Sequence, residues 1–385
     1  MDPKNYELAV ALRHALHRHP ERSNHETWTK AYLIDFLHKH TSLEIVDRGA
    51  WFYAKYFAAP GAHKIAFRAD FDALPIDETI SLPYGSEIPG VSHKCGHDGH
   101  SATLAAFALE VDQRGAENTI YFIFQHAEET GDGAKECAAL ITEEGIEEVF
   151  GYHNQPGYPV GEVIVNDGSF QCTSKGMSLF FEGAPSHASD PEVGRNPALA
   201  IARLICALPS LYRAQEYAGL VLSTVVHVEI GAPAFGTAAS TGVLRVTLRG
   251  EHEAEMNCFE ARLDALACEL ASEYGLKYHA EFCDYFPECY NHPESAAKVR
   301  AVCAKLNIPV HAFPHSKRGS EDFGYYTKAT KGALFNIGAG DITPHHRLHM
   351  IFQMPSLKLR FPCLRGLPGW RKTENASSVH ALFCF

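Results

Sequence analysis

The sequence predicts an α/β protein in which a domain built on a mainly parallel sheet is interrupted by a smaller α+β segment. In the first and last parts of the chain, short apolar runs alternate with helical patterns, as is typical of βα units. In the middle third, strand-like runs stand beside long helical stretches. The length of 385 residues fits about two domains. We therefore expect one discontinuous domain over residues 1–171 and 286–385, and a second over residues 172–285.

Each element of the first domain follows from a local pattern. Apolar residues at helical spacing predict helices over residues 4–18 and 25–40, and Pro20 separates the two. Short apolar runs predict strands, and helical patterns lie between them. The expected strands span 64–68, 119–124, 149–152 and 333–337, and the expected intervening helices span about 98–112 and 133–143.

The middle segment has patterns of its own. Its strand-like runs mix with long helical stretches, which indicates a compact insertion with antiparallel strands. The expected strands span 176–182, 221–230 and 242–249, and the expected helices span 196–208 and 253–273.

Composition excludes several classes of protein. Apolar residues make up 46% of the chain and charged residues 21%, and the formal net charge is −12. This charge makes nucleic acid or an anionic membrane an unfavourable partner. No uninterrupted apolar run is long enough for a membrane span, and the N-terminal residues lack the features of a signal peptide, so we expect a cytoplasmic protein.

Cysteine usage agrees with a reducing compartment. The 11 cysteines are an odd number, so we expect free thiols. Cys206, Cys268 and Cys303 lie in helical patterns, where we expect them to be buried as small apolar residues.

A dense set of metal-binding side chains occupies residues 93–101. Cys95 and His97 are separated by one residue, and Asp98 and His100 stand beside them. A thiolate with imidazoles favours zinc, cobalt or nickel over harder ions, although manganese is also compatible with such a mixed set. Asp98 is expected to cap the helix that follows.

Further ligand-type residues follow the predicted strands. Taken singly, an acidic pair can be a solvated loop and a histidine can be structural. Open α/β sheets, however, bind ligands beyond the carboxyl ends of their strands, and four strand exits each deliver such residues. They are Asp70 and Asp72, Glu128 and Glu129, His153, and finally His345, His346 and His349. Together they predict a metal site, in which one adjacent carboxylate binds metal and the other exchanges a proton with water.

Six motifs between about residues 8 and 349 resemble a known family. It is that of the di-metal amidohydrolases that include hippurate hydrolase, N-acyl-amino-acid hydrolases and plant auxin-conjugate hydrolases, within the aminoacylase and glutamate-releasing carboxypeptidase superfamily. The motifs are His17-Arg-His-Pro-Glu21, Arg68-Ala-Asp-Phe-Asp-Ala-Leu-Pro75, Cys95-Gly-His-Asp-Gly-His100, Gln125-His-Ala-Glu-Glu129, Ser186-His-Ala-Ser189 and Ser320-Glu-Asp-Phe323. The cysteine-bearing motif is specific to this branch.

The resemblance implies two divalent ions (Zn, Mn, Co or Ni) and a role for each matching residue. Glu128 would be the general base that activates water and then protonates the leaving amine, and Asp72 would orient a group of the metal site. The implied metal ligands are Cys95, which would bridge the two ions, and His97, Glu129, His153 and His349.

The resemblance also assigns roles to the middle segment. In the family it is a lid that commonly dimerises, so we expect a homodimer formed through the lid. His187 would stabilise the oxyanion. The alternative is that His187 is an ordinary histidine of a surface loop. Arg195 and Asn196 would bind the carboxylate of a small N-acyl amino acid. The alternative is that Arg195 is simply an exposed arginine at the start of a helix.

The C-terminal segment departs from the family pattern. Residues 350–385 hold five basic residues (Lys358, Arg360, Arg365, Arg371 and Lys372) against the single acidic residue Glu374. This inversion of the chain's charge balance indicates an altered reading frame or a divergent tail. It leaves open whether His349, His346 or His345 supplies the last ligand, or whether that ligand is lost.

Three functions therefore stand side by side. The resemblance favours a metal-dependent amidohydrolase that cleaves the amide bond of N-acyl amino acids or small peptide-like conjugates. The unusual tail keeps open a catalytically silent homologue that binds small molecules. A structural zinc protein fits poorly, because closed structural sites are usually rich in cysteine.

Overall fold

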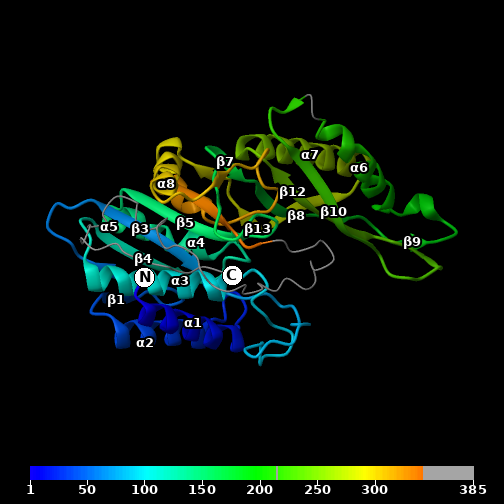
Figure 1. The fold of residues 1–385 in the computed structure, drawn as a ribbon. Coiled ribbons are helices and arrows are strands. Elements are labelled where there is room, and N and C mark those ends of the chain that lie inside the picture. Colours follow the sequence, from blue (N-terminus) through cyan, green and yellow to red (C-terminus); the bar gives the residue numbers. More distant parts are fainter. Residues whose placement is uncertain (214–215, 341–385) are drawn as a thin grey trace. The chain divides into compact units, whose positions relative to one another are not determined.

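The computed structural model describes residues 1–213 and 216–340. Two compact units make up the chain (Figure 1). Among the described residues, unit 1 comprises Met1–Phe170, Cys289–His315 and 322–340, and unit 2 comprises Gln171–Glu288 with Ser316–Glu321. The two segments of unit 2 lie next to each other, because the N–H of Cys172 in the first donates to the carbonyl of Lys317 in the second.

Unit 1 is built on an eight-stranded, mainly parallel sheet, which confirms the predicted fold class. β3 runs parallel to both β4 and β5, and β5 runs parallel to β16, whereas β1 and β2 join antiparallel at one side. In spatial order the strands are β1 (Glu44–Asp47), β2 (Phe52–Tyr56), β4 (Thr119–Gln125), β3 (Lys64–Asp70), β5 (Glu148–Gln155), β16 (Lys331–Gly338), β6 (Val163–Ile164) and β15 (Val310–His311).

Helices cover both faces of this sheet because its central strands are apolar on both sides. Alternate residues of one strand enter different clusters, as Phe67 and Ala66 of β3 do. One cluster holds side chains of α1 (Pro3–Arg18), α2 (Thr27–His40), α3 (His97–Arg114) and α8 (Pro293–Lys305). The other holds side chains of α4 (Gly133–Cys137) and α5 (Ala139–Glu144), together with Tyr326 of α9 (Gly324–Ala329).

The helix predicted over residues 133–143 is present as two short helices. α4 and α5 meet at Ala138, which caps one and begins the other. No proline or glycine marks the break, so helical periodicity alone could not locate it. β1, β2 and β15 were not predicted from the sequence. β1 and β15 are short and little buried, whereas β2 is a strand of 5 residues whose first three are buried.

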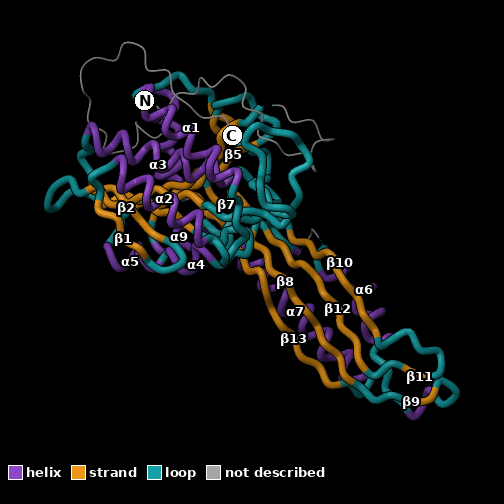
Figure 2. The backbone as a smooth tube through the Cα atoms, turned by 90° about the horizontal axis from the view of Figure 1, so that it is seen from below, coloured by secondary structure: helices purple, strands orange, loops and turns teal. Residues whose placement is uncertain are grey.

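Unit 2 contains a four-stranded antiparallel sheet (Figure 2). Its apolar face, with Leu179 and Leu244, packs against two long helices. The strands are β10 (Val221–Ile230), β12 (Thr241–Gly250), β8 (Thr173–Glu182) and β13 (Lys277–Phe286), and the helices are α6 (Ala198–Leu211) and α7 (Glu253–Glu273). The sequence did not predict β13, whose residues are largely exposed at the sheet edge.

Within unit 2, small elements lie apart from the main sheet. β9 (Ser186–His187) pairs antiparallel with β11 (Thr237–Ala238), and the short helix η1 (Pro191–Val193) follows β9. A separate pair, of β7 (Gly168–Gln171) with β14 (Cys289–Asn291), belongs to unit 1 except for Gln171. No helix in the described ranges is both long enough and apolar enough to cross a membrane.

The nine cysteines in the described residues are all free, as predicted. Cys303 is buried on α8, but Cys206 and Cys268 are exposed, so the prediction of burial is wrong for these two. On α6 and α7 the neighbours Leu204 and Ala267 face the sheet, and the cysteines fall on the outer side of each helix.

Candidate metal centre

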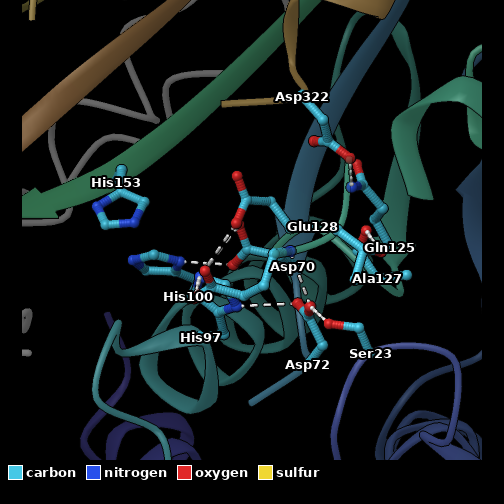
Figure 3. A network of polar contacts seen from close by, with 12 residues as sticks. Ser23, Asp70, Asp72, His97, His100, Gln125, Ala127, Glu128, His153 and Asp322 are labelled. Atoms are coloured by element: carbon cyan, nitrogen blue, oxygen red, sulfur yellow. Dashed lines mark hydrogen bonds and ion pairs between the residues drawn. The ribbon is translucent and has the colours of Figure 1, made fainter. Parts of the chain in front are cut away.

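The candidate site lies where the central strands of unit 1 end. After β3 the chain runs through α3 to β4 on one side, and after β4 it returns to β5 on the other side of β3. Adjacent parallel strands whose connections diverge leave a crevice at their carboxyl ends. Asp70 ends β3 and Asp72 follows it, Glu128 follows β4, and His153 lies near the end of β5, while His97 begins α3 (Figure 3).

His97 is the residue around which the site is arranged. Its Nδ1 lies 3.0 Å from Asp72 Oδ1, and its Nε2 is buried without a hydrogen-bond partner in the described part of the chain. Carboxylate oxygens of three acids surround Nε2, at 3.9 Å for Asp70, 3.9 Å for Glu128 and 3.8 Å for Glu129. These separations are too long for hydrogen bonds.

Two groups of side chains with metal-ligand atoms share His97. One consists of Cys95, His97 and Glu129, and the other of His97, His100 and His153; in each group the ligand atoms lie within 4.8 Å of one another. His153 Nδ1 lies 2.7 Å from the carbonyl oxygen of Asn154, so Nδ1 carries the proton and Nε2 presents its lone pair. Neutral imidazole binds metals in this form.

Asp70 and His100 form a buried framework beside these ligands. Asp70 Oδ2 accepts from Arg68 at 2.7 Å, and Asp70 Oδ1 lies 2.6 Å from His100 Nδ1. His100 Nε2 in turn lies 2.9 Å from Asn154 Oδ1. Burial opposes ionisation, but His97, Arg68 and His100 hold the pKa of Asp70 well below its usual value. Both ring nitrogens of His100 are thus engaged by protein groups, and this residue supports the site.

Arg68 extends the framework into the core. Its guanidinium also contacts Asp322 Oδ1 at 2.7 Å and Gln125 Oε1 at 2.6 Å, and all these groups are buried. The amide of Gln125 donates to the other oxygen of Asp322, at 2.7 Å. The buried charges are therefore paired and hydrogen-bonded, as burial requires.

The electrostatics of the site fit a divalent cation. Burial alone would lower the pKa of His97, but Asp70 and Asp72 outweigh it and raise the pKa to about 10. Burial raises the pKa of Glu129, with Asp72 adding to the effect. Glu129 Oε1, like His97 Nε2, is buried without a hydrogen-bond partner among the described residues. Carboxylates thus gather around buried atoms that lack hydrogen bonds.

The spacing fits a metal as well. Two ligand atoms about 2.1 Å from one tetrahedral ion stand about 3.4 Å apart. The distances around His97 Nε2 are close to this value, and a mixed set of thiol, imidazole and carboxylate groups is a donor set that zinc, cobalt or nickel accepts. The residues present therefore fit the expected metals.

Asp98 does not cap α3, which corrects the prediction. The cap position is Gly96, and no side chain caps the helix there. Asp98 Oδ2 instead lies 2.7 Å from His17 Nδ1 and accepts from Arg13 Nε at 3.1 Å. Its carboxylate is turned toward α1 because Asp98 lies inside the first turn, where those cations reach it. Asp98 ties α1 to α3.

Three predicted site residues lie in unit 2. His187 is exposed on β9, and its Nδ1 lies 2.7 Å from Ser189 Oγ. Arg195 and Asn196 are exposed in the segment before α6. Asn196 Oδ1 accepts from Ala198 N–H at 2.9 Å, so this side chain braces the start of α6. His345, His346 and His349 lie outside the described residues.

The structure adds Ser23 to the site, and it places Asp70 and His100, which the sequence offered as candidate ligands, in a supporting framework. Asp70 and His100 stood inside the quoted motifs, but only their contacts reveal a supporting role. Ser23, whose Oγ donates to Asp72 Oδ2 at 2.7 Å, carried no signal in the sequence. A lone serine in the loop between two helices cannot be distinguished from a surface residue without the fold.

Comparison with known proteins gives consistent matches. The model of a family described as peptidase family M20/M25/M40 matches residues 66–357. An uncharacterized hydrolase of Staphylococcus haemolyticus is 32% identical over 364 residues, which cover 90% of this chain and 93% of the relative.

Two solved structures share the fold. A candidate aminohydrolase of methicillin-resistant Staphylococcus aureus has a TM-score of 0.82 at 27% identity and covers 89% of this chain and 90% of its own. The YXEP protein of Bacillus subtilis, described as a dinuclear metal-binding peptidase, has a TM-score of 0.76 at 25% identity and covers 90% and 92%.

Proposed function

The chain belongs to the peptidase family M20/M25/M40, a family of hydrolases, and from this premise we propose that it cleaves the amide bond of N-acyl amino acids or small peptide-like conjugates with two divalent metal ions. One observation carries the proposal. His97 Nε2 is buried and unpaired among the described residues, with three carboxylates within 3.9 Å, beside the cysteine and the second histidine of a metal-ligand set.

Four described residues would hold the ions. Cys95, His97, Glu129 and His153 supply the ligand atoms, and His349 is the further ligand that the motif pattern implies. When bound, divalent ions lower the pKa of water from ~15.7 toward ~7 and polarise an amide carbonyl. The B. subtilis relative described as dinuclear supports the count of two. Zinc, cobalt and nickel suit the thiolate, and manganese suits the carboxylates.

Glu128 is suited to move the proton. It is buried, and its Oε2 lies 3.9 Å from His97 Nε2 at the edge of the ligand set. There Glu128 takes a proton from the attacking water and later gives it to the departing amino group, which completes the cleavage of the C–N bond. Asp72 keeps the imidazole of His97 in one orientation throughout.

Unit 2 would supply the remaining contacts to substrate. With His187 Nδ1 engaged by Ser189, Nε2 is the atom that would donate to the developing oxyanion. Arg195 is exposed and suited to a substrate carboxylate. For Asn196, the amide nitrogen is the group that would face substrate, because the oxygen supports α6.

We also propose a cytoplasmic homodimer formed through unit 2. In the described part of the chain, β10 is an edge strand that pairs only with β12, and Val225, Val226 and Val228 on it are exposed. An exposed apolar edge strand is a template for pairing with a second chain. Light scattering should give a dimer for the wild type and a monomer for Val226→Asp.

A substrate screen tests the proposed activity. The protein, loaded with Zn, Mn or Co, is offered acetyl-, benzoyl- and indoleacetyl-amino acids, and the release of free amino acid is measured. The wild type should release it, and Glu128→Gln should be slower by ~10²–10⁴-fold with normal metal content. Normal metal content without turnover on any substrate would instead favour a silent binding protein.

A further inference from the structure

A buried alanine in a left-handed conformation precedes the two site glutamates. Ala127 has φ +46°, a region in which the Cβ atom of an L-residue is crowded. The other non-glycine residues with positive φ in the described chain are Asn24, Asp284 and Asn307, whose types tolerate this conformation. Ala127 has no such side chain, so the surrounding structure must impose its backbone angle.

Hydrogen bonds hold the Ala127 peptide from both sides. Glu26 Oε1 accepts from Ala127 N–H at 2.8 Å, in a buried contact between residues 101 positions apart. The Ala127 carbonyl accepts from Gly133 N–H at 3.0 Å. A Cβ atom on Gly133 would lie 1.7 Å from the His126 carbonyl oxygen, so only glycine allows this close approach. The turn between β4 and α4 is therefore clamped rather than free.

The Glu26 side chain does not serve the helix that follows it. It stands at the cap position of α2, yet it makes no side-chain capping bond to that helix. No ion pair of Glu26 occurs among the described residues. Its contact with Ala127 needs an acceptor oxygen at the end of a side chain of this length, whatever its charge.

We propose that Glu26 is a positioning residue that holds Ala127 in the left-handed turn and thereby aims Glu128 and Glu129 into the metal centre. Glu129 N–H donates to Asp72 Oδ2 at 3.0 Å, which fixes the next peptide in the same arrangement. If the clamp on Ala127 is removed, the backbone relaxes toward negative φ and both carboxylates move. This inference deepens the proposed function and rests on it for the roles of the two glutamates.

Two conservative variants distinguish the length of the Glu26 side chain from its charge. Glu26→Gln keeps an acceptor oxygen at the same distance and loses the charge, whereas Glu26→Asp keeps the charge and is one methylene too short. We expect Glu26→Gln to stay within about threefold of the wild type in kcat. Glu26→Asp should lose on the order of 100-fold in kcat, because displacement of a reacting group by about 1 Å has that effect, and KM should change much less.

A second-site change then tests the backbone itself. Glycine adopts positive φ without crowding, so Ala127→Gly should restore at least about tenfold of the kcat lost in Glu26→Asp. Zinc affinity, measured by calorimetry on all four proteins, should fall ~10–100-fold in Glu26→Asp and recover in the double variant. Hydrogen exchange of the peptide that contains Ala127 should speed up only where the clamp is broken.

The outcomes are decisive in both directions. Equal defects in Glu26→Gln and Glu26→Asp would overturn the inference, since charge would then be the essential property. So would wild-type zinc affinity and exchange in Glu26→Asp, or a double variant no better than the single one. If the wild type releases no amino acid at all, the proposed function fails, while zinc affinity and exchange still judge the role of Glu26.

Discussion

Asp72 Oδ1 lies 3.0 Å from His97 Nδ1, and the other oxygen of the same carboxylate accepts from Ser23 Oγ and from Glu129 N–H. Burial would raise the pKa of Asp72, but the hydrogen bond from His97 outweighs it and the pKa is lowered. The ionised carboxylate therefore fixes the proton of His97 on Nδ1 and directs Nε2 toward Asp70, Glu128 and Glu129. One side chain thus joins three separate segments of unit 1.

Asp72→Asn should weaken metal binding. The asparagine side chain has one acceptor oxygen where aspartate has two, so it cannot accept from both His97 and the Ser23 and Glu129 donors. His97 then loses its fixed tautomer, and zinc affinity should fall ~10–100-fold. Calorimetric titration with zinc measures the change. Asp35→Asn serves as the control, because Asp35 is an exposed acid paired with Lys39 on α2. Equal affinities for the wild type and Asp72→Asn would contradict the orienting role.

Cys95→Ser should change metal preference more than metal capacity. Thiolate sulfur favours zinc and cobalt over manganese, so loss of the sulfur should lower zinc affinity at least about tenfold and manganese affinity far less. The cobalt-loaded wild type should also show a thiolate-to-cobalt absorption that the variant lacks. Cys206→Ser, at an exposed site on α6, is the matched control. A cobalt spectrum unchanged by Cys95→Ser would remove the thiol from the ligand set.

His17 should make the stability of the protein depend on pH in the alkaline range. Burial lowers its pKa, but Asp98 and Glu78 outweigh burial and raise the pKa from 6.5 to about 9. The folded state therefore binds the proton more tightly than the unfolded state. The resulting stabilisation, at most about 3 kcal/mol, is complete below pH 6.5 and is lost as pH rises through about 9.

Urea unfolding between pH 6 and 10 measures this effect. The wild type should lose stability steadily as pH rises, and His17→Gln should show a flatter dependence over the same range. Identical slopes for the two proteins would show that the His17 proton does not contribute.

Gly151→Ala should destabilise the sheet of unit 1. A Cβ atom at Gly151 on β5 would lie 2.6 Å from Phe323 Cε2 and 3.0 Å from Leu334 Cδ1, which are buried with it. Overpacking of this kind costs about 1–3 kcal/mol, so the melting temperature should fall. Gly236→Ala is the control, since no atom lies within 4 Å of its added Cβ. A melting temperature unchanged in Gly151→Ala would mean that Phe323 moves aside freely.

The sequence could predict elements whose causes are local. Apolar periodicity fixed the type of β3, β4, β5 and β16 and of α1, α2 and α3, because each pattern reports its own buried face. The kinds of metal ligand could also be predicted from a local pattern, because Cys95 and His97 are close neighbours in the chain. The sequence alone thus determined an α/β fold and the chemical character of a metal site.

Only the tertiary structure decided how those groups face one another. Asp98 stands beside His97 in the chain, yet it turns to His17 and Arg13, whereas Glu26, which lies 101 residues from Ala127, reaches its backbone. Orientation depends on which strand and helix neighbours fill the space around a side chain, and these neighbours come from distant parts of the sequence. Residue type therefore predicted the kind of chemistry, but the packing of β3, β4 and β5 determined which of these groups face one another.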